Sequence, residues 1–110
     1  MAEGIRSQVK DPAKPFSLIV KVRVKEGKAA AFEAAFSEAM KQTRKEKGCL
    51  RYDLNREKES VLDYVIYERW ADLEAVKTHL SAAYIAKLFS LVGELADGAP
   101  KMELLLPAGE

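Results

Sequence analysis

Few side chains in this chain can exchange a proton near neutral pH, and they gather in one stretch. Residues 61–84 hold the only histidine, His79, the only tryptophan, Trp70, and three of the four tyrosines. An imidazole has an ordinary pKa near neutrality, so it can accept a proton from a phenol or an enol. The chemistry that this stretch favours is therefore proton abstraction from an aromatic or enolic substrate.

His79 and Glu68 are the two candidate catalytic residues. His79 could act as a general base, or it could be a structural histidine that satisfies a helix end or a neighbouring carboxylate. Glu68 falls on the strand face that points toward the helices, where an unpaired buried charge is costly. Its carboxylate could orient His79 or hold a substrate hydroxyl, or it could form an ion pair with a helix lysine or arginine.

Four aromatic side chains are candidates for binding a flat substrate ring: Trp70, Tyr52, Tyr64 and Tyr84. Their rings could line a pocket while the hydroxyls fix the orientation of the substrate, although each could equally fill the core. Arg51 could bind an anionic group such as a phosphate, but it falls on the strand face opposite Tyr52, which favours an ion pair at an interface. Cys49 has no base beside it in the sequence and is expected to be a strand residue rather than a nucleophile.

Composition narrows the class of protein. The 110 residues are 48% hydrophobic, and 18 basic and 17 acidic residues give a net charge of +1. This favours one globular domain without the net basic face of a nucleic-acid binder. A single cysteine and a single histidine allow no internal disulfide and no Cys/His metal site. No signal peptide or membrane-spanning segment is evident, so we expect a cytoplasmic protein.

Hydrophobic spacing predicts the elements that position these residues. Two-residue alternation predicts strands at 16–24, 49–56, 61–70 and 101–106. Three- and four-residue spacing predicts helices at 28–47, 73–80 and 82–96. Asp72 and Ser81 are expected to cap the last two helices, and Gly48 is expected to end the first in a left-handed conformation.

The order of these elements predicts an α+β fold of the ferredoxin-like, split βαββαβ type. It has a four-stranded antiparallel sheet with both helices on one face. The other face carries large apolar side chains among charges: Ile19, Val65, Tyr67 and Leu105. Such a face is seldom left in water, so we expect a homodimer in which sheet packs on sheet. Residues 1–15 are expected to be a flexible arm, or an arm that packs on a partner subunit, and residues 108–110 a tail.

At this point a resemblance to a known family emerges. Residues 48–54 form a G-x-x-x-Y strand, Glu68 and Trp70 form an E-x-W strand end, and His79 follows the tryptophan by nine positions. In this order the motifs resemble the antibiotic biosynthesis monooxygenase family, over residues 16–107. The resemblance implies a dimeric ferredoxin-like α/β barrel with the domain at those residues.

The resemblance also implies several activities. The first is a cofactor-independent monooxygenase that oxidises a quinol or polycyclic phenol, with His79 as base. The alternatives are an isomerase of a small phosphorylated autoinducer-like substrate, for which Lys87 and Arg51 are the few cationic candidates, and a non-catalytic small-molecule-binding dimer. Relatives often carry a second histidine or another polar group near the start of the last helix, where this chain has residues 81–84 and no second imidazole. The haem-degrading members use a His–Trp pair and an asparagine on the first strand, and that asparagine is absent here.

Overall fold

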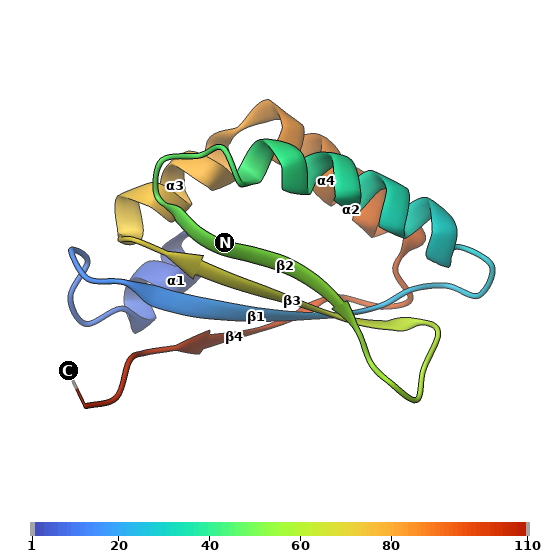
Figure 1. The fold of residues 1–110 in the computed structure, drawn as a ribbon, viewed down its shortest axis with the longest axis horizontal. Helices are drawn as coiled ribbons and strands as arrows, with labels where there is room; N and C mark the ends of the chain where they lie inside the picture. The colour runs from blue at the N-terminus through green and yellow to red at the C-terminus, as the bar shows by residue number, and fades with distance from the viewer. Residues whose placement is uncertain (1, 110) are drawn as a thin grey trace.

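Antiparallel strands form one sheet of four, with helices packed on one of its faces, and Figure 1 shows this arrangement. The computed structural model describes residues 2–109. The strands are β1 (Phe16–Arg23), β2 (Cys49–Arg56), β3 (Asp63–Trp70) and β4 (Lys101–Leu105). The helices are α1 (Ala2–Gln8), α2 (Ala29–Thr43), α3 (Leu73–Ser81) and α4 (Ala83–Leu95). The ferredoxin-like βαββαβ order that the sequence predicted is confirmed, with α2, α3 and α4 covering the sheet.

The strands lie in the order β2-β3-β1-β4, so β3 and β1 form the centre of the sheet. In the β1–β3 pair, Val20 lies opposite Ile66 and Ile19 lies opposite Tyr67. Every second residue of β3 is buried, from Tyr64 to Trp70, and the residues between them are half-buried. The alternation therefore gives the sheet an inner face beneath the helices and an outer face that none of the helices within residues 2–109 covers.

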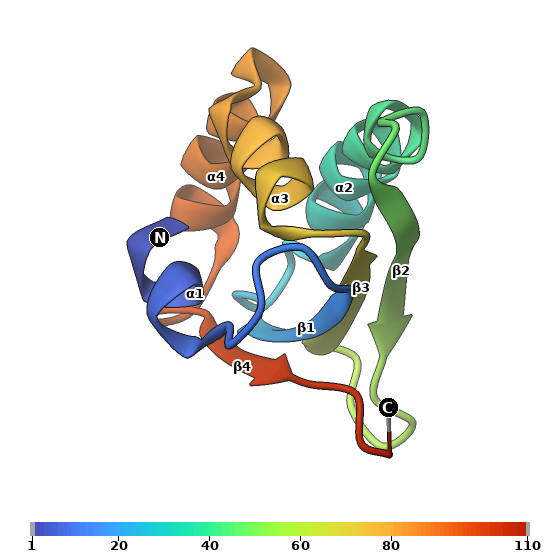
Figure 2. The ribbon, with the colours of Figure 1, turned by 90° about the vertical axis from the view of Figure 1, so that its left-hand side faces the viewer.

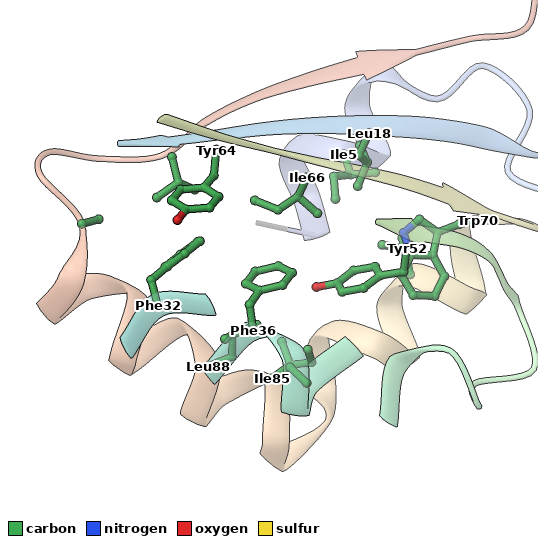
Figure 3. Packing of buried hydrophobic residues seen from close by; sticks show 14 of the residues in the cluster. Ile5, Leu18, Phe32, Phe36, Tyr52, Tyr64, Ile66, Trp70, Ile85 and Leu88 are labelled. Carbon is green, nitrogen blue, oxygen red and sulfur yellow. The ribbon is translucent and has the colours of Figure 1, made fainter. Parts of the chain in front are cut away.

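Aromatic side chains fill much of the space between the inner face and the helices (Figure 3). The ring of Phe36 from α2 stacks on that of Tyr52 from β2, with the centroids 5.8 Å apart. Phe32 lies beside Tyr64, with a centroid separation of 4.8 Å. Burial of such rings is the main force that holds a helix on a sheet.

The helix α2 ends at Thr43, four residues before the predicted end. Beyond it the amides of Lys45 and Glu46 bond to carbonyls three residues back, so the chain runs through consecutive tight turns. Gly48 follows these turns, but it does not have the left-handed conformation that was predicted. A side chain there would place Cβ 2.2 Å from Cβ of Ala75 in α3, so glycine lets the chain pass close to that helix.

The two predicted helix caps have different outcomes. Asp72 caps α3 as predicted, because its carboxylate accepts a hydrogen bond of 2.8 Å from the amide of Ala75. The prediction that Ser81 caps α4 is wrong. Ser81 still belongs to α3, where its hydroxyl donates to the carbonyl of Thr78, and α4 begins after Ala82 without a side-chain cap.

The N-terminal segment contains an element that the sequence did not predict. Helix α1 lies within residues 1–15 and beside the β4 edge of the sheet, as Figure 2 shows. Its Ile5 is completely buried. One apolar residue within a short polar helix leaves no periodic signal, so only the tertiary contact reveals it. None of the helices within residues 2–109 is long and apolar enough to cross a membrane.

Candidate active site

A cavity of about 350 Å³ lies between the inner face of the sheet and the helices. Strand side chains such as Leu18, Ile66 and Met102 form one wall, and helix side chains such as Phe36 and Leu88 form another. Only three described lining residues are polar, namely Tyr52, Glu68 and His79. An apolar pocket of this size with a few convergent polar groups is typical of a small-molecule site.

His79 lies in the last turn of α3 and is almost fully buried. Its Nδ1 lies 2.9 Å from a carboxylate oxygen of Glu46. The carboxylate accepts a hydrogen bond from Nδ1–H, and this tautomer leaves the lone pair on Nε2. Burial lowers the pKa of His79, and the charge of Glu46 only partly offsets this. The ring is therefore a neutral base at pH 7.

Glu46 links three elements through its carboxylate. It lies in the turns after α2, and the oxygen that holds His79 also accepts a hydrogen bond from the hydroxyl of Tyr84 in α4. That hydroxyl lies 3.2 Å from the side-chain oxygen of Thr43. The second oxygen of Glu46 is buried without a hydrogen-bond partner among the side chains that the structure describes. Tyr84 thus helps to hold the carboxylate that binds Nδ1 of the imidazole.

Glu68 projects from β3 into the same region and is 8% exposed. The indole Nε1 of Trp70 donates a hydrogen bond of 3.0 Å to its carboxyl group, and within residues 2–109 no ion pair with a lysine or arginine forms there. Burial raises the pKa of Glu68 to about 7, the charge of Glu46 adds to this rise, and the hydrogen bond from Trp70 opposes it. At neutral pH this carboxyl group can both donate and accept a proton.

Trp70 and Tyr52 surround the imidazole with aromatic rings. The indole of Trp70 is fully buried, with its centroid 4.5 Å from that of His79. The indole ring packs against His79, and its Nε1–H is bonded to Glu68. Tyr52 lines the cavity, with its ring centroid 5.5 Å from that of the imidazole. Burial raises the pKa of Tyr52, and the nearby Glu68 raises it further, so the phenol stays neutral.

The other sequence candidates lie outside the cavity. Tyr64 donates a hydrogen bond to Glu33 of α2 and borders a separate surface hollow. Arg51 pairs with Asp53 at 2.8 Å on the outer side of β2. Burial raises the pKa of Cys49 to about 11, so it remains a thiol. Within residues 2–109, no group of three or more metal-binding side chains is arranged to hold an ion.

Sequence reasoning missed Glu46. It lies in a run of charged residues, 44–47, that was expected to form the exposed last turn of a helix. Glu46 is the only acidic residue of that run, but no local pattern reveals its partner, because the contact with His79 joins residues 33 positions apart. The one signal was indirect, since a buried histidine requires a partner and a carboxylate is the usual one.

Comparisons with known proteins give a consistent picture. The profile described as antibiotic biosynthesis monooxygenase matches residues 15–90. A candidate monooxygenase of this type from Caulobacter crescentus CB15 is 29% identical, with a TM-score of 0.81 over 86% of this chain and 90% of that chain. A protein from Bacteroides thetaiotaomicron, described as a conserved protein of unknown function, is 28% identical, with a TM-score of 0.78 over 84% and 97% of the two chains.

Rv0793 from Mycobacterium tuberculosis is 25% identical, with a TM-score of 0.82 over 88% of this chain and 98% of that chain. The comparison with curated proteins gives no match. The solved structures share the ferredoxin-like fold described above. Because the family profile spans well over half of the 110 residues, this chain belongs to the antibiotic biosynthesis monooxygenase family.

Proposed function

We propose that the protein is a cofactor-independent monooxygenase that oxidises a quinol or a related polycyclic phenol with dioxygen. The observation that supports this most is the 2.9 Å contact between Nδ1 of His79 and Glu46, which leaves Nε2 of a cavity-lining imidazole as a base. The largely apolar wall suits a flat, uncharged ring system. Glu68, with its pKa of about 7, supplies a second proton-exchanging group.

The first step is removal of the substrate proton. His79 takes the proton of a phenol or enol and becomes an imidazolium, which the charge of Glu46 stabilises. The resulting anion is rich in electrons and passes one to dioxygen, and the two radicals combine at a ring carbon to form a peroxide. The apolar lining keeps water away from these reactive species.

The later steps return both residues to their starting states. Protonated Glu68 gives its proton to the peroxide and then takes the proton of the ring carbon, while the O–O bond breaks and a C=O bond forms. The hydroxide that leaves accepts the proton held by His79. One dioxygen is consumed, one oxygen atom enters the product and the other leaves as water, so protons and electrons balance.

The cavity favours this activity over isomerisation of a phosphorylated substrate. A phosphate requires arginine, lysine or a cluster of backbone amides. None of the described lining residues is a lysine or an arginine. Arg51 is engaged with Asp53, and Lys87 borders a shallow groove between α2 and α4 instead.

A non-catalytic dimer would fit a core in which aromatic side chains leave no room for a ligand. The cavity of about 350 Å³ and the imidazole on its wall argue for an enzyme instead. We keep the homodimer itself as part of the proposal. Ile19, Tyr67 and Leu105 lie on the outer face of the sheet, which no helix covers, and Leu105 is 41% exposed. A second copy of that face would remove these groups from water.

The test is oxygen consumption by metal-stripped protein with a panel of small quinols and anthrones. His79→Ala is expected to lower turnover by roughly a hundredfold or more, the effect of losing a general base. Thr78→Ala, an exposed neighbour on the same helix, is the matched control and should retain wild-type turnover. Equal turnover in the wild type and His79→Ala would remove His79 from the mechanism. No turnover by the wild type on any substrate would contradict the proposed reaction.

A further inference from the structure

Helix α1 contributes to the cavity although it precedes the residues that the family profile matches. The family profile begins at residue 15, and α1 spans Ala2–Gln8. Its Ile5 is 0% exposed and lines the cavity together with Leu18 and Met102. Figure 3 shows the side chain of Ile5 close to Leu18, at the sheet side of the core. One side chain of the cavity lining thus comes from the segment before the matched residues.

The segment that contains α1 is bonded to α3, the helix that carries His79. The amide of Leu73, the first residue of α3, donates a hydrogen bond of 2.9 Å to the carbonyl of Pro12. Helix α1 also packs against α3, and Val9 packs against the core. Gly4, Arg6, Ser7 and Gln8 are exposed. Ile5 is therefore the residue through which α1 enters the site.

We propose that α1 is a fixed wall of the cavity and that Ile5 is a specificity-determining residue that limits the size of the ring system admitted. A fused aromatic ring cannot bend around a side chain, so one branched residue in a cavity of about 350 Å³ sets a length limit. The identity of the substrate rests on the proposed monooxygenase function. The claim that α1 forms part of the cavity wall rests only on the position of Ile5.

The first experiment measures access to the cavity without any turnover. In a Cys49→Ser background, which removes the only native thiol, Met102→Cys places a thiol in the cavity lining and Lys101→Cys places one on the exposed side of the same strand. The labelling rate of each thiol with a bulky neutral maleimide is measured, and their ratio is compared between variants. Ile5→Ala should make Met102→Cys react roughly tenfold faster relative to Lys101→Cys, which corresponds to about 1.4 kcal/mol of activation barrier.

Two further changes at α1 complete this experiment. Ile5→Trp should slow the labelling of Met102→Cys, because the larger ring takes up space in the cavity. Arg6→Ala alters an exposed neighbour on the same helix and should leave the ratio unchanged. If Ile5→Ala does not fold, as judged by circular dichroism, Ile5→Val and Ile5→Trp decide the question. An unchanged ratio in the folded variants would overturn the proposal.

The second experiment compares turnover of a tricyclic anthrone with that of a bicyclic quinol. Ile5→Ala removes three carbons and should shift the ratio of kcat/KM toward the larger substrate by about tenfold or more, since one methylene in an apolar pocket already has an effect of about that size. Ile5→Trp should shift it the other way. A change in the labelling ratio without any turnover would support Ile5 as part of the cavity wall and contradict the proposed monooxygenase function. Turnover without a change in the labelling ratio or in the substrate ratio would support the monooxygenase function and contradict the role of Ile5.

Discussion

Strand β3 carries two carboxylates on opposite faces of the sheet, and their surroundings differ in every respect. On the outer face, Asp63 lies 2.7 Å from the hydroxyl of Ser60 and 2.7 Å from the guanidinium of Arg23. Those partners lower its pKa. On the inner face, Glu68 is buried beside Trp70, and its pKa is raised to about 7.

The contrast separates an ion pair from a group that can exchange protons. A solvated carboxylate with a cation beside it stays ionised and contributes little beyond local order. A carboxyl group that burial has pushed toward neutrality holds a proton that it can give up at working pH. One strand thus supplies both kinds of group, because successive residues face opposite sides.

The largest expected effect comes from removing the inner carboxyl group. Glu68→Gln preserves the shape of the side chain but cannot exchange a proton, so we expect turnover to fall by roughly a hundredfold or more. Asp63→Asn makes the same change on the outer face and should leave turnover near that of the wild type. Both are measured by oxygen consumption. Equal losses of turnover in Glu68→Gln and Asp63→Asn would contradict the claim that only the inner carboxyl group takes part in the reaction.

Stability should also depend on pH in opposite ways for the two carboxylates. The folded-state pKa of Glu68, about 7, lies above the unfolded value of about 4.3, so the folded protein binds more protons in this interval. Its contribution is present at low pH and is lost as pH rises toward 7, by up to about 3 kcal/mol. The lowered pKa of Asp63 has the opposite sign, so its contribution is lost as pH falls below about 3.9.

Urea unfolding of the wild type and Glu68→Gln at pH 5 and pH 8 checks this expectation. The variant should lack the decline with pH that Glu68 produces. His79 has a lowered pKa, so its own contribution is lost as pH falls below about 6.5, but both proteins share that term and it cancels in the comparison. Parallel pH profiles of the two proteins would refute the assignment to Glu68.

Glu46 is expected to have an intermediate effect, as a positioning residue for His79. Glu46→Gln should lower turnover by roughly tenfold through looser placement of the imidazole. It should also move the acid limb of the pH–rate profile to lower pH, because the carboxylate charge that raises the pKa of His79 is gone. Tyr84→Phe retains that charge and should leave the midpoint in place. A midpoint that does not move in Glu46→Gln would reduce Glu46 to a structural role.

The smallest effect on chemistry is expected from the outer face. Ile19 does not line the cavity, so Ile19→Glu should change turnover least while it disrupts the proposed dimer. Light scattering should give about 24 kDa, twice the chain mass of 12.2 kDa, for the wild type and the mass of one chain for the variant. Lys58→Glu, in the turn between β2 and β3, introduces a glutamate away from that face and should remain dimeric. A wild type with the mass of one chain would reject the dimer.

The sequence predicted the fold well where a pattern repeats along one element. Alternation in 16–24 and 61–70 gave β1 and β3 with the correct inward faces, because burial of every second residue is a local signal. It gave the ends of helices less well. The last residues predicted for α2 form turns instead, and Glu46 in those turns contacts His79, a pairing that no local pattern records.

The candidate site shows the same limit. The strand face of Glu68 and Tyr52, and the helix edge of His79, followed from spacing alone, and the structure brings these three residues into one cavity. The roles of Tyr64 and Tyr84 could not be read in this way. Their hydroxyls point to the carboxylates of Glu33 and Glu46, and those pairings depend on how the helices sit over the sheet. Ile5 was missed for the same reason.

The most direct test is a pH titration of the indole ¹⁵Nε1 shift of Trp70. It is the only tryptophan, and its Nε1–H donates to Glu68, so the signal reports the ionisation of that carboxyl group. We predict a midpoint of about 7 that disappears in Glu68→Gln and persists in Asp63→Asn. A midpoint below about 5, near the ordinary pKa of a glutamate, would contradict the claim that the inner face holds a proton-exchanging carboxyl group.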